Sequence, residues 1–156
     1  MPYRICKSFQ IESGHMLAKH PGLCRFPHGH SRTVEVVIAS ENLNGQDMVC
    51  DFKTVKLALK DFLARFDHAI AMNSDDPSLA AMRSSPVGER VIVFEKIDPT
   101  TEVLAERIFR FLEGELCAGR TYTDPEGGRF AFVPGLRVER VRVSETSSTW
   151  AEFSAG

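Results

Sequence analysis

The sequence predicts an α+β fold, in which an antiparallel sheet carries two helices packed on one face. Near both ends of the chain, polar and apolar residues alternate with a period of two, which is typical of half-buried strands. Between them, two segments repeat apolar residues at helical spacing. Because strands and helices do not alternate regularly, an antiparallel sheet is favoured over a doubly wound parallel one. Such a sheet has open edges, which oligomerisation can cover.

The first two strands are predicted at residues 4–15 and 33–40. In the first, Phe9 and Ile11 fall on the same side of the strand as His15. The second, TVEVVIAS, is rich in the β-branched residues that strands favour. A loop rich in glycine, proline and histidine joins the two, so we expect them to pair as neighbours and the loop to be functional.

Two helices follow from periodicity and capping signals. Residues 51–66 place their apolar side chains at helical spacing, and Asp51 is the expected N-cap. The segment DPTTE at residues 98–102 has the marks of a second helix start, with Asp98 or Thr100 as the cap and a proline suited to the first turn.

The other segments complete the predicted order. Residues 73–89 are polar and contain proline, which indicates a loop, and residues 90–95 form a short strand. Residues 118–135 are rich in glycine and proline and are predicted as a second loop. Strands at residues 136–144 and 149–153 close the chain.

Length, composition and charge limit the possible classes of protein. The chain has 156 residues, of which 43% are hydrophobic and 26% charged, so we expect a single domain over residues 1–156. The net charge of −2 gives no argument for a nucleic-acid partner. The opening residues lack an apolar signal-peptide core, and no stretch of about 18 apolar residues could span a bilayer. We therefore expect a cytoplasmic protein without membrane contact.

Three histidines form the strongest functional signal. In extended chain, residues i and i+2 face the same way, so His28 and His30 of the HGH motif can bind one ion. His15, at the end of the neighbouring strand, is a natural third ligand. Three neutral imidazoles leave zinc one open position, the arrangement of catalytic sites. The alternative is that HGH is a polar turn without metal.

Cys24 lies four residues before His28. The four cysteines are far apart with no CxxC pair, which favours reduced thiols over a disulfide framework. Beside a divalent cation and Arg25, the Cys24 thiol would ionise more readily and could act as general base or nucleophile. It could instead be a fourth zinc ligand that closes a structural site. The spacing leaves both possibilities open.

Asp67 and His68 follow the first predicted helix directly. A carboxylate that accepts the imidazole proton fixes the tautomer of the histidine and raises its basicity, as in acid–base relays. Alternatively, His68 simply complements the negative end of the helix dipole.

Glu145 falls on the same side of its strand as Val141 and Val143. A carboxylate on an apolar face needs a partner. The N–H edge of an amino-pyrimidinone ring would satisfy both oxygens, and so would an arginine.

The segments that contain these residues resemble the 6-pyruvoyl-tetrahydropterin synthase / 6-carboxy-tetrahydropterin synthase family. The matching segments are FQIESGH, CRFPHGH, MVCDF, FDHAIAMN, DPTTE and VRVSET, and they span nearly the whole chain. The resemblance implies a tunnelling fold (T-fold), with subunits that assemble into hexamers of two trimers and active sites between subunits. It also implies zinc at His15, His28 and His30, a proton-transfer set of Cys24, Asp67 and His68, and pterin anchoring by Glu145, Thr100 and Thr101.

The spacing CxxxHGH resembles the 6-carboxy branch of this family, whereas the 6-pyruvoyl branch usually has two more residues before HGH. The 6-carboxy branch converts 7,8-dihydroneopterin triphosphate on the way to 7-deazaguanines such as queuosine. The alternatives are 6-pyruvoyl synthesis, a non-catalytic pterin- or purine-binding zinc module, and a metal-dependent hydrolase. The chain departs from the family pattern in DHAIAMN, one residue longer than the common DHxxLN, and in Gly14, where alanine is usual.

Overall fold

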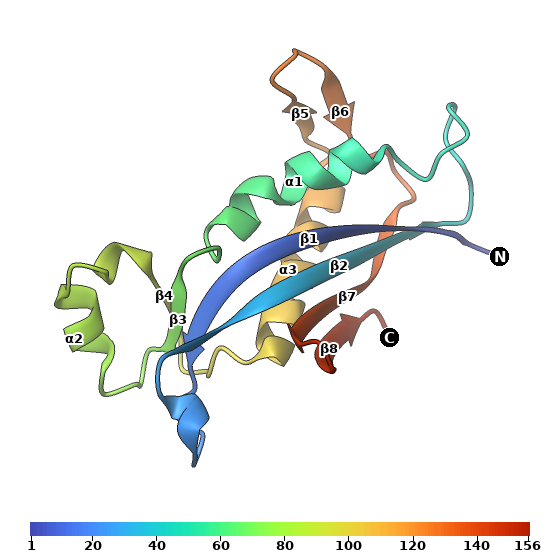
Figure 1. The fold of residues 1–156 in the computed structure, drawn as a ribbon. Helices are drawn as coiled ribbons and strands as arrows, with labels where there is room; N and C mark the ends of the chain where they lie inside the picture. Colours follow the sequence, from blue (N-terminus) through green and yellow to red (C-terminus); the bar gives the residue numbers. More distant parts are fainter.

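A computed structural model describes residues 1–156 and contains one large sheet, a small hairpin and three α-helices (Figure 1). The elements are β1 (Tyr3–Met16), η1 (Leu23–Arg25), β2 (His28–Ser40), α1 (Phe52–Ala64), β3 (Ile70–Asn73), α2 (Leu79–Ser84), η2 (Gly88–Arg90), β4 (Val91–Phe94), α3 (Thr101–Ala118), β5 (Thr121–Thr123), β6 (Arg129–Ala131), β7 (Arg137–Thr146) and β8 (Thr149–Ser154). The large sheet has the strand order β4-β3-β1-β2-β7-β8, and β5 pairs with β6.

The long strands β1 and β2 form the centre of the sheet and curve together across the molecule (Figure 1). They pair antiparallel from Tyr3 opposite Ser40 to His15 opposite His28, which confirms that they are neighbours. The strand β2 begins at His28, so the HGH motif is already extended chain paired with β1. This pairing decides where the histidines lie.

The prediction of a purely antiparallel sheet is wrong at one edge. Residues 70–72 of β3 run parallel to the end of β1, with Gly14 opposite Ile70, and β3 and β4 are parallel as well. Because β3 has four residues, it is too short to show a period of two in the sequence. The sheet is therefore mixed, antiparallel from β1 through β8 and parallel toward β4.

Both predicted helices are present with the expected caps. The Asp51 carboxylate accepts a hydrogen bond from the Lys53 N–H at 2.8 Å, and the Thr100 hydroxyl accepts one from the Val103 N–H at 3.2 Å. In Figure 1, α1 lies along β1, and α3 passes behind β1 and β2. At Gly119, φ is +61°, a left-handed conformation that ends α3 without a Cβ clash.

The two segments predicted as loops contain further elements. Residues 73–89 include the six-residue helix α2, and residues 118–135 include the β5–β6 hairpin. These elements are three to six residues long, less than two helical turns or a strand of usual length. The structure thus has three α-helices instead of the predicted two.

The core lies between the sheet and the two long helices. It comprises 22 buried residues, among them Val34, Val36, Leu59, Ile108 and Val141. Alternate residues of β2 and residues of α1 and α3 meet in it, as the two periodicities predict. The core supports the strand ends that carry the histidines.

None of the helices has the length and apolar character needed to cross a membrane.

Candidate metal centre

Three imidazoles converge at the end of the β1–β2 pair. His15 lies on β1, and His28 and His30 lie on β2, with His15 directly opposite His28. Their candidate ligand atoms all lie within 4.8 Å of one another. Between the two β2 histidines, a Cβ on Gly29 would lie 3.3 Å from the Ser13 carbonyl oxygen, so glycine allows a close approach of the strands. The structure therefore brings together all three histidines that the sequence singled out.

Backbone carbonyls orient two of these rings. The Nδ1 atom of His15 lies 2.8 Å from the Pro99 carbonyl oxygen, and that of His28 lies 2.8 Å from the Phe26 carbonyl oxygen. Because a carbonyl oxygen only accepts, each Nδ1 donates, and the Nε2 of the neutral ring keeps its free lone pair. Metal-ligating histidines commonly make such contacts, which leave the Nε2 lone pairs available to a metal.

The spacing of the nitrogens fits a zinc ion. Two imidazole nitrogens bound to one tetrahedral zinc at about 2.0–2.1 Å lie roughly 3.3–3.4 Å apart. The Nε2 atoms of His15 and His30 are 3.2 Å apart. Three imidazoles without a thiolate would leave a four-coordinate zinc one position for substrate or water.

Burial keeps His15 and His30 neutral. His15 is 1% exposed, and burial lowers its pKa to about 4, assisted by the positive charge of Arg32. The pKa of His30 is lowered as well, first by burial and then by Arg32. Both rings are therefore unprotonated near neutral pH, as metal binding requires.

Arg32 is a buried cation beside the cluster that the sequence analysis missed. Its guanidinium donates to the Ser13 hydroxyl and to the Thr101 hydroxyl, both at 2.8 Å, and its Nη2 lies 3.5 Å from His15 Nδ1. No carboxylate lies within 4.0 Å of it, and burial lowers its pKa. The available signal was periodicity, because Arg32 shares the buried face of β2 with Val34.

Glu145 reaches the same cluster from β7. The β7–β8 register shifts between Ser144 and Thr146, so Glu145 has no partner on β8. Its side chain lies on the face of Val141 and Val143, as the period of two predicts, because Val143 pairs with Val34 beside the β2 histidines. Its Oε1 atom lies 3.4 Å from His30 Nε2 and 3.6 Å from His15 Nε2. The partners of this carboxylate within the chain are histidines, and no arginine forms an ion pair with it.

Thr100 and Thr101 lie at the start of α3, and both hydroxyls have partners in the chain. Thr100 caps the helix, and Thr101, 4% exposed, accepts from Arg32. The segment therefore links α3 to the histidine cluster through the Pro99 carbonyl and the Arg32 side chain.

Cys24 lies in η1, on the loop between β1 and β2. Its thiol is free and half-buried, and it does not belong to the metal-binding group, which consists of the three histidines. The loop is held by the Leu17 N–H, which donates to the Cys24 carbonyl at 3.0 Å, and by the Lys19 N–H, which donates to the buried Asp98 carboxylate. In this structure the Cys24 thiol therefore lies outside the group of candidate metal ligands.

Asp67 and His68 form a pair in a constrained turn after α1. The Asp67 Oδ1 accepts from the Glu12 N–H at 2.7 Å, while Oδ2 lies 3.0 Å from His68 Nδ1. The backbone hydrogen bond, followed by His68, holds the pKa of Asp67 below its usual range. His68 has φ +56°, and its N–H donates to the Glu12 carbonyl at 2.6 Å. These contacts match the relay geometry and leave Nε2 of His68 free to accept a proton.

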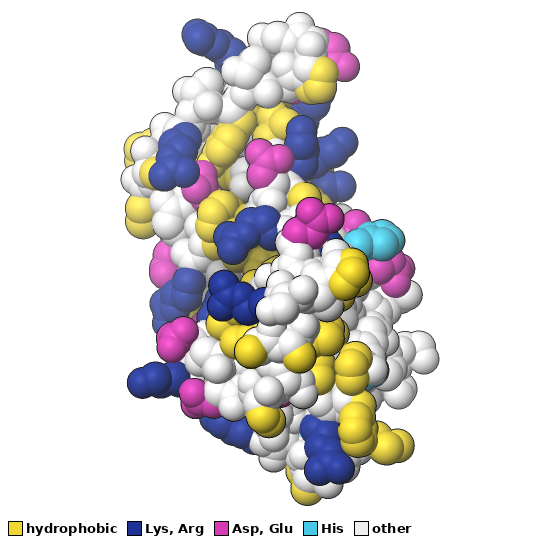
Figure 2. Space-filling view, turned by 90° about the vertical axis from the view of Figure 1, so that its left-hand side faces the viewer, with side chains coloured by type: hydrophobic (Ala, Val, Ile, Leu, Met, Phe, Trp, Pro, Cys, Tyr) yellow, Lys and Arg dark blue, Asp and Glu magenta, His cyan; other side chains and the backbone are white.

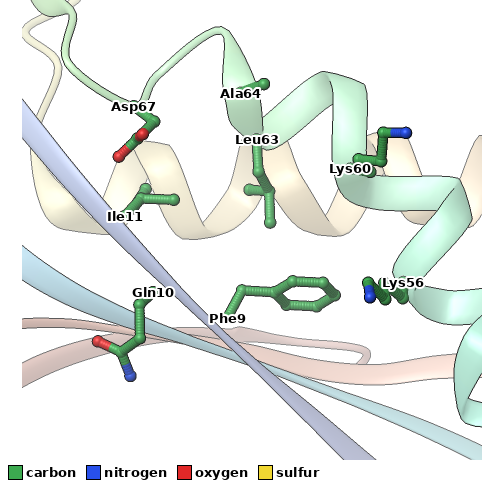
Figure 3. A pocket seen from close by; sticks show the side chains of 8 residues that line it. All are labelled: Phe9, Gln10, Ile11, Lys56, Lys60, Leu63, Ala64 and Asp67. Atoms are coloured by element: carbon green, nitrogen blue, oxygen red, sulfur yellow. The ribbon is translucent and has the colours of Figure 1, made fainter.

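The His68 side chain is 77% exposed, and no hydrogen bond or ion pair joins it to the histidine cluster. Its neighbour Asp67 also lines a groove of about 230 Å³ between β1 and α1 (Figure 3). Lys56 and Lys60, one helical turn apart on α1, line the same groove. Within one chain, no hydrogen bond or ion pair links Asp67 or His68 to the three histidines.

Comparison with known proteins places these features in a family. The family model described as 6-pyruvoyl tetrahydropterin synthase matches residues 4–156. A relative from Aquifex aeolicus, named 6-carboxy-5,6,7,8-tetrahydropterin synthase, is 30% identical over 98% of each chain. A probable enzyme of that name from Halobacterium salinarum is 33% identical over 70% of this chain and 69% of its own.

Solved structures share the fold. An uncharacterized protein from Wolinella succinogenes has a TM-score of 0.78 and 21% identity, covering 100% of this chain and 99% of its own. The 6-pyruvoyl tetrahydropterin synthase of Plasmodium vivax has a TM-score of 0.70 and 17% identity over the same shares. Because the family model spans residues 4–156 and a relative is 30% identical over 98% of each chain, this chain belongs to the 6-pyruvoyl tetrahydropterin synthase family.

Proposed function

We propose that this chain is a zinc-dependent lyase that converts 7,8-dihydroneopterin triphosphate to 6-carboxy-5,6,7,8-tetrahydropterin, acetaldehyde and triphosphate. The observation that carries the proposal is the convergence of three imidazoles, two of which donate an Nδ1 proton to a backbone carbonyl. The names of the curated relatives support the 6-carboxy product, and so does the spacing of Cys24 four residues before His28.

His15, His28 and His30 would hold the metal. Bound there, zinc would act as a Lewis acid that acidifies the C–H and O–H groups of the substrate side chain. The proposed work of the protein is then proton transfer. Cys24, as thiolate, removes a proton from the side chain, and His68 Nε2, oriented by Asp67, acts as the second acid–base group.

The overall conversion balances without a redox cofactor, because the side chain is oxidised as the dihydropterin ring is reduced. The electrons that leave the side chain carbons enter the ring, and triphosphate leaves with its bridging oxygen. One water is consumed as the carbon–carbon bond breaks: two carbons of the side chain take its hydrogen and leave as acetaldehyde, and the carbon that stays on the ring takes its oxygen and becomes the carboxylate. The protein has to move protons between these centres and exclude side reactions.

Glu145 would anchor the pterin ring, assisted by Thr100 and Thr101. Its carboxylate lies at the edge of the cluster and is 35% exposed, so one oxygen can face a ligand while the other lies near His30. A carboxylate suits the adjacent N–H donors of an amino-pyrimidinone. This anchoring would set the position of the side chain relative to Cys24.

The proposed assembly is a homo-oligomer, a hexamer of two trimers with active sites between subunits. The supporting observation is that the His68 side chain is exposed and that neither it nor Asp67 forms a hydrogen bond or ion pair with the histidines of its own chain. A second copy could bring this pair, together with the Lys56 and Lys60 groove, to the substrate. We further propose a cytoplasmic role in 7-deazaguanine (queuosine) biosynthesis.

Product analysis tests the proposal directly. The zinc-loaded protein is incubated with 7,8-dihydroneopterin triphosphate, and the products are identified by mass spectrometry. We expect 6-carboxy-tetrahydropterin together with acetaldehyde. A 6-pyruvoyl product would move the chain to the other branch of its family, and binding without turnover would make it a non-catalytic zinc module.

A further inference from the structure

A second pocket lies between α1 and α3 and shares no residue with the histidine cluster. It has a volume of about 450 Å³, within the range usual for small-molecule sites. We call it the α1–α3 pocket, and the residues that matter here are Phe62, Arg65, Phe66, Ile97, Arg107 and Arg110. Figure 2 shows the left-hand side of the molecule as seen in Figure 1, where basic side chains border recessed apolar surface.

Two arginines of this pocket have no counter-charge. Neither Arg65 nor Arg107 has a carboxylate within 4.0 Å. The third, Arg110, lies 3.7 Å from Glu106, the acidic residue that lines the pocket, and 3.2 Å from Glu113. The pocket is therefore positive, because its one carboxylate, that of Glu106, is already paired with Arg110.

Arg65 and Arg107 line the same pocket, and the fold limits how the Arg107 guanidinium can turn. The Arg107 guanidinium carbon lies 3.7 Å from the centroid of the buried Phe94 ring, which limits the orientations of the group. Burial, and then the charge of Arg65, lower the pKa of Arg107. Two like charges brought together in a partly buried site repel each other unless an anion lies between them.

The remaining walls are aromatic and aliphatic. Phe62 stacks on Phe111 with ring centroids 4.1 Å apart and planes 8° apart, so its position is fixed from behind. Phe66 is 4% exposed, whereas Ile97 is 40% exposed at the rim. An apolar surface beside two guanidinium groups suits a ligand with one anionic end and one apolar end.

We propose that the α1–α3 pocket binds a small organic anion, whose carboxylate or phosphate lies between Arg65 and Arg107 and whose apolar body lies against Phe62 and Ile97. A guanidinium group donates two parallel hydrogen bonds to such an oxyanion, which gives geometry as well as charge complementarity. The site is independent of the proposed reaction, because none of its residues takes part in it.

Isothermal titration with phenyl phosphate, benzoate and inorganic phosphate tests the proposal on the full chain. Phenyl phosphate or benzoate should bind saturably, and whichever binds more tightly identifies the preferred oxyanion. Arg65→Gln and Arg107→Gln should each weaken that binding roughly ten-fold, because hydrogen bonds to charged groups are strong. Inorganic phosphate should bind more weakly than phenyl phosphate, since it lacks the apolar body.

Arg129→Gln is the matched control, because Arg129 is an exposed arginine of β6 outside the pocket. It should leave binding unchanged. Equal weakening in Arg129→Gln would show bulk charge attraction, and undiminished binding in Arg65→Gln would place the anion elsewhere, for instance at the histidines. Either result, or no saturable binding, overturns the proposal. Arg65 is exposed, so its variant remains informative even if Arg107→Gln unfolds.

Discussion

Arg32 and Thr101, 69 residues apart in the sequence, share a buried hydrogen bond of 2.8 Å from Nη1 to the threonine hydroxyl. The bond joins the start of α3 to the strand that carries two of the three histidines. We expect Thr101→Val to lower the free energy of unfolding by about 1–3 kcal/mol, because it leaves a buried donor without its acceptor. Urea denaturation measures this difference. Thr101→Ser keeps the hydroxyl and should stay near wild type; equal losses in both variants would assign the effect to packing.

Replacing Cys24 tests whether its thiol acts as a general base or as a zinc ligand. The three histidines form the metal-binding group without this thiol, so Cys24→Ala should keep one zinc per chain while turnover disappears. Metal content by atomic absorption and product formation are measured on the same sample. Cys117→Ala, a change at an exposed cysteine on α3, serves as the control and should retain both. Loss of zinc from Cys24→Ala would instead identify the thiol as a ligand.

Removal of the metal should abolish turnover without unfolding the chain. The ligands lie on strands that pair from Tyr3 opposite Ser40 to His15 opposite His28, so the backbone holds them in place independently of an ion. After chelation, the far-UV circular dichroism spectrum should stay the same, and the melting temperature should fall as the stabilisation by ligand binding is lost. Added zinc should restore activity. A spectrum of an unfolded chain after chelation contradicts this expectation.

Glu145→Gln should raise KM for the pterin substrate about ten-fold or more while zinc content is unchanged, because the amide offers one acceptor where the ring presents two donors. Steady-state kinetics and metal analysis together distinguish an anchor from a ligand. Glu139→Gln is the matched control on the same strand, where the carboxylate pairs with Arg4 away from the histidines. If Glu145→Gln loses its zinc, the carboxylate belongs to the coordination sphere.

Asp67→Asn should change the acid stability of the protein. The Glu12 N–H and then His68 hold the pKa of Asp67 below its usual range, so the ionised carboxylate stabilises the fold above the unfolded pKa of about 3.9. That contribution is lost as the pH falls through the lower pKa of the folded state. Urea unfolding between about pH 5 and about pH 2 should therefore show a smaller loss of stability in Asp67→Asn than in wild type. Equal pH dependence would contradict it.

Sequence periodicity predicted the long elements well because each covers several repeats. The strand β1 has 14 residues and α3 has 18, and both begin within three residues of the predicted positions. The strands β3, β5 and β6 have three or four residues, which is too short for a pattern to emerge. Strand direction is also invisible in a hydrophobic pattern, so the parallel pairing of β3 with β1 could not be foreseen.

The same distinction between local pattern and tertiary packing applies to the candidate site. His28 and His30 lie two residues apart on one strand, so their convergence follows from local geometry, and His15 follows from the pairing of neighbouring strands. The contact of Arg32 with Thr101 depends on how α3 packs against the sheet, which no local pattern encodes. The period of two places Glu145 on the face of Val141 and Val143, but its approach to the histidines depends on the pairing of β7 with β2. Tertiary packing, not local sequence, decides these contacts.

The groups that orient His15 and His28 are the main-chain oxygens of Pro99 and Phe26. Every amino acid supplies such an oxygen, so the tautomer of each ligand does not depend on which side chain stands at these two positions. Protein engineers can therefore vary the side chains at Phe26 and Pro99, with Cys24 kept, provided the backbone path is kept. At these two positions a new side chain can be introduced beside the metal centre while the ligands keep their orientation.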